Sequence, residues 1–173
     1  MRANSINTSA PLAFNRNISL LLVKQNHEIL IDDEDYSIVS GYTWHIVEGS
    51  SGVLYAQTHL TVSGKRTTKL MHKLILNAAR VDHINRNGLD NRKTNLRAAT
   101  AQQNGANAKK RNGTSKYKGV HWNIIKSKWQ ASIFKDNTTK YLGLFNSELE
   151  AAKRYDKEAL EVYGEFAHLN IKE

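Results

Sequence analysis

Runs of apolar and β-branched residues, separated by polar turns, mark the first 70 residues as a β-rich region. Such runs predict five strands, at residues 18–23, 28–31, 43–47, 53–62 and 66–70. Gln25 and Asn26 predict a hairpin turn between the first two strands, and turns rich in Gly and Ser separate the last three. We therefore expect a small antiparallel sheet, which could act as a scaffold or as a second surface for a polyanionic partner through Lys65, Arg66 and Lys69.

Two shorter segments follow a different pattern. Residues 32–35 are all acidic and precede apolar positions, which favours a helix N-terminus because carboxylates suit the helix dipole. A metal site made of these carboxylates is the alternative. Residues 71–77, with the sequence MHKLILN, indicate a short buried helix or strand.

The last third of the chain predicts three strands and one amphipathic helix. The strands are expected at 117–122, 128–134 and 140–145. Ser147 and Glu150 have the spacing of a capping box at a helix start, and Gly164 is suited to end the helix. The apolar side chains at helical spacing are Leu149, Ala152, Tyr155, Ala159 and Val162. We expect this helix to cover one face of a three-stranded sheet and to leave the other face open.

The candidate chemistry lies between residues 81 and 107. Asp82 and His83 are adjacent on a short apolar segment, so that their side chains point to opposite faces of a strand. Thr100 and Gln103 form a capping box, which places Asn104 just inside a helix. A carboxylate and an amide oxygen suit Mg²⁺, and a neutral imidazole can take a proton from water. The chain has no Cys, which excludes a thiolate zinc site.

These residues resemble the HNH homing endonucleases of phages and group I introns. The matching segments are DHINRNGLDNR, NLRAAT and Asn104. The resemblance implies a ββα-metal arrangement in which His83 is the general base, while Asp82 and Asn104 bind one Mg²⁺ or Mn²⁺ ion. It also implies that Asn95 holds the base in place across the loop. Many HNH enzymes have His where this chain has Asn104, which is a weaker ligand. His72 resembles a His found upstream of the motif and is either structural or functional.

The charge of the chain points to nucleic acid. The formal net charge is +9 and the isoelectric point is about 9.7, with Lys and Arg spread among Trp, Tyr and Asn. No apolar run is long enough to cross a membrane, and the first 17 residues lack the apolar segment of a signal peptide. The absence of Cys fits a reducing cytoplasm, which the resemblance places in a phage-infected or bacterial cell.

A second resemblance covers the C-terminal region. The segments KYKGVHW, KWQASI and YLGLFNSELEAAKRYDKEALEVYGEFAHLN resemble the APETALA-type DNA-binding domain of plant ethylene-response factors. That resemblance implies a sheet that enters the major groove of double-stranded DNA. Lys replaces Arg at several positions, which weakens bidentate reading of guanine and retains contact with phosphate. The expected DNA contacts are His72, Arg92, Arg97, Lys109, Lys110, Arg111, Lys118, Trp122, Lys126, Lys128, Trp129 and Lys140. For the two Trp residues, a place in the core under the helix is the alternative.

The sequence thus predicts an α+β protein with a small N-terminal antiparallel sheet, a ββα-metal HNH motif, and a three-stranded sheet packed on one helix. The expected segments are a disordered N-terminus (1–17), a β-rich module (18–70), the nuclease motif (71–107), a basic linker (108–114) and the DNA-binding domain (115–173). We expect an endonuclease that acts as a monomer and nicks DNA. A DNA-binding regulator without catalysis and an RNA-binding structural protein are the alternatives.

Overall fold

A computed structural model of the chain describes residues 18–23, 27–110 and 112–171. The chain divides into two compact units, Met1–Ala99 and Thr100–Glu173. The expectations for residues 1–17, for the turn at Gln25 and Asn26, and for Arg111 lie outside the described residues. Small antiparallel sheets combined with helices confirm the expected mixture of α and β structure. Within the described residues, no helix is both long and apolar enough to cross a bilayer.

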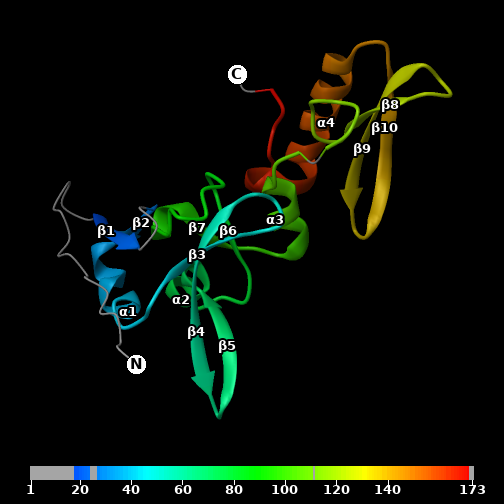
Figure 1. Cartoon of the computed structure of the whole chain (residues 1–173). Helices are drawn as coiled ribbons and strands as arrows, with labels where there is room; N and C mark the ends of the chain where they lie inside the picture. Colours follow the sequence, from blue (N-terminus) through cyan, green and yellow to red (C-terminus); the bar gives the residue numbers. More distant parts are fainter. Residues whose placement is uncertain (1–17, 24–26, 111, 172–173) are drawn as a thin grey trace. The chain divides into compact units, whose positions relative to one another are not determined.

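The described residues of the first unit form three small antiparallel sheets, whose strands are labelled in Figure 1. The strands are β1 (Ile18–Val23), β2 (His27–Asp32), β3 (His45–Glu48), β4 (Leu54–Val62), β5 (Lys65–Leu70), β6 (Val81–His83) and β7 (Leu96–Ala98). They pair as β1-β2, β3-β4-β5 and β6-β7. The helical segments are η1 (Asp33–Asp35), α1 (Tyr36–Val39), α2 (Met71–Leu76) and η2 (Lys93–Asn95). The five expected strands are therefore present, and the acidic cluster opens a helical segment as predicted.

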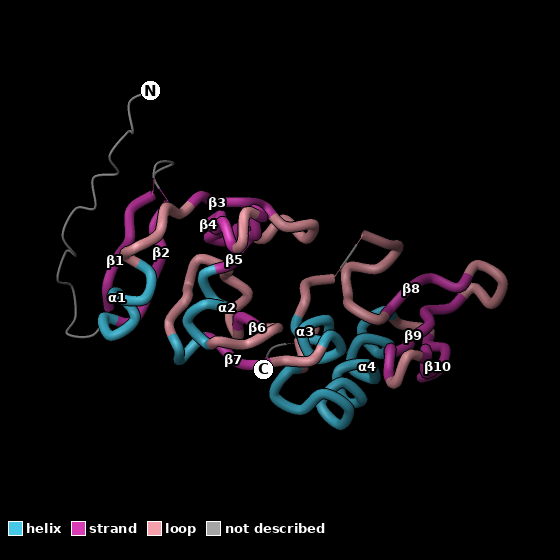
Figure 2. Tube along the Cα trace, turned by 90° about the horizontal axis from the view of Figure 1, so that it is seen from below, coloured by secondary structure: helices cyan, strands magenta, loops and turns pink. Residues whose placement is uncertain are grey.

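Helix α2 organises the core of the first unit. It lies between the three-stranded sheet and the β6-β7 pair (Figure 2). Met71 at its start is fully buried, together with Ile29 and Ile31 of β2, which alternate with partly exposed residues. Asn77 ends the helix in the left-handed conformation with φ 47°, which Asn tolerates better than most residues. The segment 71–77 is thus a helix, and it brings one side of α2 against β6.

The second unit contains the predicted three-stranded sheet and its helix. The elements are α3 (Ala101–Asn107), β8 (Val120–Asn123), β9 (Lys128–Lys135), β10 (Thr138–Phe145), α4 (Glu148–Tyr163) and η3 (Gly164–Phe166). The strand order is β10-β9-β8, and all pairs are antiparallel. Helix α4 covers one face of the sheet, where Tyr155 and Ala159 pack against Ile133. The capping box of Thr100 and Gln103 at the start of α3 is confirmed by both of its hydrogen bonds.

The start of α4 differs from the prediction. The Ser147 hydroxyl accepts from the Leu149 N–H at 3.2 Å, whereas Glu150 is exposed and no capping box forms. The Glu148 carboxylate instead accepts hydrogen bonds from Ser115 Oγ and the Lys116 N–H, at 2.7 and 3.0 Å. Leu149 was expected on the apolar side of the helix, but its side chain is 42% exposed. Small residues line the buried face, because alanines let the helix approach the sheet closely.

Gly119 permits one such close approach between the segment before β8 and helix α4. Its φ is +73°, which L-residues rarely adopt. A Cβ atom at this position would lie 2.0 Å from Tyr155 Cδ2 and 2.8 Å from the Ser132 carbonyl oxygen. The Ser132 N–H also donates to the Gly119 carbonyl at 2.8 Å. Only glycine therefore fits between the ring and the strand.

Gly119→Ala is expected to lower the free energy of unfolding by about 3 kcal/mol, because it adds backbone strain and a clash with the Tyr155 ring. Gly105→Ala is the matched control, since a Cβ there meets nothing within 4 Å and the residue lies in α3. The control should raise stability by roughly 0.5–1 kcal/mol. Urea unfolding measures both values, and equal stability of the two variants would contradict this account of the fold.

Candidate active site

Asp82 lies opposite Arg97 on the β6-β7 strand pair. The two residues are direct cross-strand partners, and Asp82 Oδ2 accepts from Arg97 Nε and Nη2 at 2.9 and 2.8 Å. The side chains are only 5% and 12% exposed. An ion pair removed from water in this way needs good geometry to offset its desolvation, and the two donated hydrogen bonds supply it. The sequence-predicted metal ligand and the predicted phosphate contact therefore touch each other.

His83 points into an aromatic cluster. Its ring centroid lies 4.8 Å from that of His72 on α2, in an edge-to-face arrangement, and 5.9 Å from that of Tyr55 on β4. Burial lowers the pKa of the His83 imidazole below its ordinary value. The Asn91 side chain and the charges of Asp82 and Asp90 act in the opposite direction without cancelling the effect of burial. His83 is therefore neutral at pH 7, in the protonation state that a general base needs.

His72 is also held neutral. It is 4% exposed, and its Nδ1 atom has no hydrogen-bond partner among the described residues. Burial, followed by the proximity of His83 and Lys73, lowers the pKa of His72 to about 3. The Tyr55 ring closes the third side of the cluster, at 5.6 Å from His72, and burial beside Asp82 raises the pKa of its hydroxyl. Two imidazoles in contact disfavour a charge on either one, so the cluster stays uncharged.

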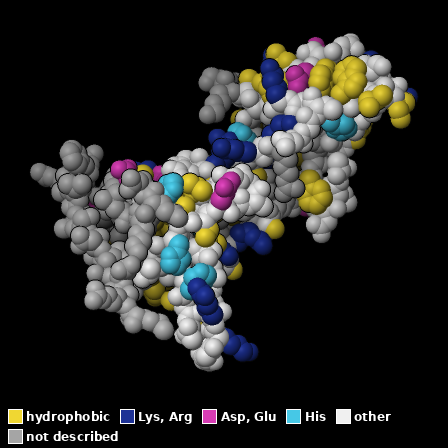
Figure 3. Space-filling model, in the orientation of Figure 1, with side chains coloured by type: hydrophobic (Ala, Val, Ile, Leu, Met, Phe, Trp, Pro, Cys, Tyr) yellow, Lys and Arg dark blue, Asp and Glu magenta, His cyan; other side chains and the backbone are white. Residues whose placement is uncertain are grey.

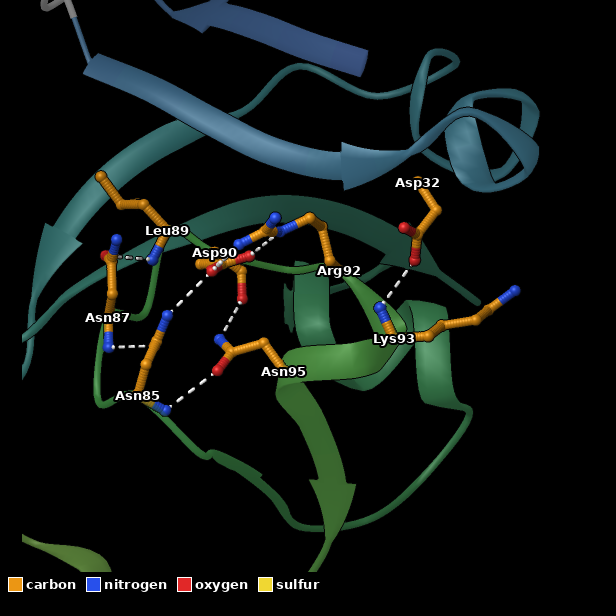
Figure 4. Close-up of polar contacts among 8 residues, drawn as sticks. All are labelled: Asp32, Asn85, Asn87, Leu89, Asp90, Arg92, Lys93 and Asn95. Carbon is orange, nitrogen blue, oxygen red and sulfur yellow. Dashed lines mark hydrogen bonds and ion pairs between the residues drawn. The ribbon is translucent and has the colours of Figure 1, made fainter. Parts of the chain in front are cut away.

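Asn95, at the end of η2, joins both sides of the loop between β6 and β7 (Figure 4). Its Oδ1 atom accepts from the Asn85 N–H at 2.9 Å, and its Nδ2 atom donates to the Asp90 carbonyl at 2.7 Å. The residue is 7% exposed, so loss of either contact would leave a buried polar group unpaired. The amide thereby fixes the loop that follows His83 directly.

Asp90 is the second centre of the loop network in Figure 4. Its carboxylate accepts from Arg92 Nε and Nη2 at 2.7 and 2.6 Å, and from Asn85 Nδ2 at 2.8 Å. Burial raises the pKa of this carboxyl, but the hydrogen bonds and charge of Arg92 outweigh burial and leave the pKa below its usual value. Arg92, an expected phosphate contact, is thus paired within the loop.

The same loop is fastened to the sheets of the first unit. The Leu30 N–H donates to the Leu89 carbonyl at 2.9 Å, and the Asn91 N–H donates to the Leu30 carbonyl at 2.7 Å. A Cβ atom on Gly88 would lie 2.3 Å from the Leu54 carbonyl oxygen of β4. The loop therefore packs its backbone directly against β2 and β4, which keeps Asn91 and Tyr55 beside His83.

Lys93 occupies the acidic cluster at residues 32–35. Its Nζ atom lies 2.6 Å from Glu34 Oε1 and 2.9 Å from Asp35 Oδ1, and its N–H donates to Asp32 Oδ2 at 2.7 Å. The hydrogen bonds that the Lys93 ammonium donates to Glu34 and Asp35 raise its pKa. These carboxylates therefore bind a lysine of the loop between β6 and β7. Among the described residues, no three His, Asp or Glu side chains come together as a metal site.

The remaining predicted contacts lie in the second unit. Asn104 is exposed on α3. The Lys118 ammonium donates to the carbonyls of Gly105, Ala106 and Ala108, and Lys140 pairs with Glu158 at 2.6 Å. Of the other lysines predicted as contacts, Lys109, Lys126 and Lys128 are exposed and Lys110 is partly exposed.

Trp122 and Trp129 are cross-strand partners and share one face of the sheet. Their rings meet edge to face, with centroids 5.1 Å apart. Trp129 packs against the cluster that contains Val120 and Ala131, under α4. Trp122 is 37% exposed at the margin of this cluster. A place at the edge of the core therefore accounts for the position of both rings.

Sequence reasoning missed three neighbours of His83, namely Tyr55, Asp90 and Asn91. Tyr55 comes from a strand far upstream in the chain, and no motif connects it to the site. Asp90 and Asn91 lie inside the loop segment, where their spacing from Asn95 was the available signal. Their roles follow from packing, since Asn91 is fully buried and Asp90 is 2% exposed.

His72→Gln is expected to weaken the pH dependence of stability. The pKa of His72 is about 3 in the folded chain and about 6.5 when unfolded, so the unfolded chain binds the proton more tightly. The resulting stability is present above pH 6.5 and is lost as the pH falls below it. Between pH 7 and pH 5 the native chain should lose about 2 kcal/mol more than the variant. Urea unfolding at the two pH values measures this, and an equal loss would contradict the burial of a neutral His72.

Comparison with known proteins identifies the family of the chain. A family model described as HNH endonuclease matches residues 77–106. The chain is also 33% identical, over 137 residues, to an uncharacterized HNH endonuclease of Acanthamoeba polyphaga mimivirus, and this similarity covers 79% of the chain and 71% of the relative. No solved structure matches the chain. The chain therefore belongs to the HNH endonuclease family, and the expected enzyme class, a nuclease that acts on DNA, is confirmed.

Proposed function

We propose that the chain hydrolyses one phosphodiester bond of double-stranded DNA per active site, with His83 as the general base and one divalent metal ion. The observation that carries this proposal is the buried, neutral imidazole of His83, which follows Asp82 on β6. One base and one ion per chain favour a nick over a double-strand break. A homing role, action as a monomer, and a cytoplasmic place of action in a phage-infected or bacterial cell belong to the same proposal.

The base takes its proton from the attacking water. A neutral imidazole accepts a proton readily, and general bases of this kind contribute about 10²–10⁴ in rate. The cluster of Tyr55 and His72 holds the His83 ring from two sides, which limits its rotation. Asn95 acts as a positioning residue, because its two hydrogen bonds fix the loop that leaves β6.

The donor set fits a hard cation. Asp82 offers a carboxylate and Asn104 an amide oxygen, which are the ligand types that Mg²⁺ and Mn²⁺ prefer, and the chain has no Cys to favour a softer ion. HNH nucleases generally use a divalent metal, and we propose that Asp82 and Asn104 hold it here. When bound, the ion would offset the charge that develops on the phosphate and on the leaving oxygen.

The Asp82–Arg97 ion pair bears on this proposal. The Arg97 guanidinium now pairs with Asp82 Oδ2. Binding of a cation by the Asp82 carboxylate would weaken this ion pair. An Arg97 released from Asp82 is suited to a bidentate contact with a DNA phosphate. Arg92 lies in the same unit and is a further proposed DNA contact beside the site, whereas the buried His72 supports the His83 ring from within the cluster.

We further propose that residues 115–173, within the second unit, form an APETALA-type domain that supplies DNA affinity. Between residues 105 and 145 the chain carries nine basic residues against one acidic residue. Lys118 binds backbone carbonyls and Lys140 binds Glu158. We therefore assign the phosphate contacts mainly to Lys126 and Lys128, with Lys109 and Lys110 as further contacts.

His83→Ala is expected to reduce nicking of supercoiled plasmid by about a thousandfold in the presence of Mg²⁺ or Mn²⁺, because the base is removed. His45→Ala is the control, since this exposed histidine lies on β3 outside the cluster. DNA affinity, measured by fluorescence anisotropy, should be unchanged in both variants. Nicking by His83→Ala at the native rate would sink the assignment of the base, and absence of nicking by the native chain would favour a regulator.

Lys126→Ala/Lys128→Ala is expected to weaken DNA binding and to reduce the slope of log affinity against log salt concentration by about 2, because each phosphate contact releases a counterion. Lys153→Ala/Lys157→Ala removes the same charge from exposed positions of α4 and serves as the control. Anisotropy titrations at several salt concentrations measure both slopes. Equal slopes in the two double variants would show that only net charge matters. That result would contradict direct phosphate contacts by Lys126 and Lys128.

A further inference from the structure

Two adjacent isoleucines are almost fully exposed in the turn between β8 and β9. The side chains of Ile124 and Ile125 are 82% and 90% exposed, more than any other large hydrophobic residue among the described ones. Figure 3 shows hydrophobic side chains at the end of this hairpin, at the upper right. Single exposed apolar residues are ordinary on protein surfaces, but two together at a projecting tip leave a substantial apolar area in water.

The turn holds the two isoleucines in this position. Asn123 Oδ1 accepts from the Lys126 N–H at 3.0 Å, which closes the turn around both side chains. Asn123 Nδ2 donates to Gln130 Oε1 on β9 at 2.9 Å, and Ser127 takes a left-handed conformation with φ 48°. The tip is therefore an ordered turn, whose side chains project away from the strands instead of folding back onto the sheet.

Lysines stand directly beside this apolar tip. Lys126 and Lys128 are exposed, and the nearest acidic residue in the sequence after the tip is Asp136, at the far end of β9. A partner that binds this tip must carry negative charge and must have an apolar interior into which the two isoleucine side chains can insert. Double-stranded DNA has this combination, because its phosphates surround a stack of bases, and apolar side chains such as Ile are known to enter between base steps.

We propose that Ile124 and Ile125 insert as a wedge between neighbouring base pairs of DNA, while Lys126 and Lys128 contact the phosphates on either side. This inference rests on the proposed DNA-binding role of the second unit and assigns to it a site that unstacks and bends the duplex. The energy of unstacking is offset by burial of the two side chains. A second copy of this chain is a poorer partner for the tip, because it would bring the lysines of both tips together.

The experiment measures unwinding of closed circular DNA, which does not require knowledge of the target sequence. The full chain carrying His83→Ala, without divalent metal, is bound to plasmid that a metal-independent topoisomerase then relaxes. A wedge that opens base steps changes the linking number of the relaxed plasmid. The tip variant is Ile124→Gln/Ile125→Gln, and the matched control is Leu149→Gln/Leu160→Gln, which changes two exposed leucines of α4 that are 42% and 52% exposed.

We expect the parent chain and the control to shift the linking number, and the tip variant to lose the shift and to bind DNA about tenfold more weakly. Retention of the shift by the tip variant overturns the inference. The inference is also overturned if the tip variant changes only the self-association of the chain, as measured by sedimentation. Plasmid nicking by the chain with native His83 tests the proposed function separately. Nicking without any shift in linking number would support the proposed nuclease function and overturn the proposed insertion of Ile124 and Ile125.

Discussion

The two hydrogen bonds of the Asn95 amide are the constraint on which the candidate site depends. They connect η2 with the Asn85 N–H and the Asp90 carbonyl, and so close the loop that begins directly after His83. The loop in turn carries Asn91 to the imidazole and packs Gly88 against β4. Without this closure, the backbone that follows His83 would be free to move, and the imidazole would lose the fixed direction that its proposed role as a general base requires.

Buried carboxylates and buried imidazoles lie close together in the first unit, and each type of group is stabilised in a different way. The Asp82 carboxylate accepts two hydrogen bonds from Arg97, and the hydrogen bonds and charge of Arg92 hold the pKa of Asp90 below its usual value. Burial lowers the pKa values of His72 and His83 and leaves both imidazoles neutral at pH 7. The result is a site in which a carboxylate and an uncharged base follow each other in the chain. In the proposed function, the carboxylate attracts the cation and the imidazole accepts the proton.

Local patterns allowed a good part of this molecule to be predicted. The capping box of Thr100 and Gln103, the strands of both units and the Gly164 stop depend on neighbours in the sequence, and the structure confirms them. The cluster around His83 depends on how α2 packs between β4 and β6, which no local pattern encodes, so Tyr55 could not be foreseen. The prediction that Leu149 is buried was wrong for a related reason. Helical spacing is compatible with more than one buried face, and the small alanines determine which face packs on the sheet.

The central claim is that residue 83 is a neutral imidazole in the folded chain at pH 7. The nitrogen chemical shifts of the His83 ring, measured by NMR on the full chain with labelled histidine, test it most directly. The account predicts one protonated and one unprotonated ring nitrogen at pH 7. Two protonated nitrogens, as in an imidazolium, would contradict it and would leave the site without its proposed base.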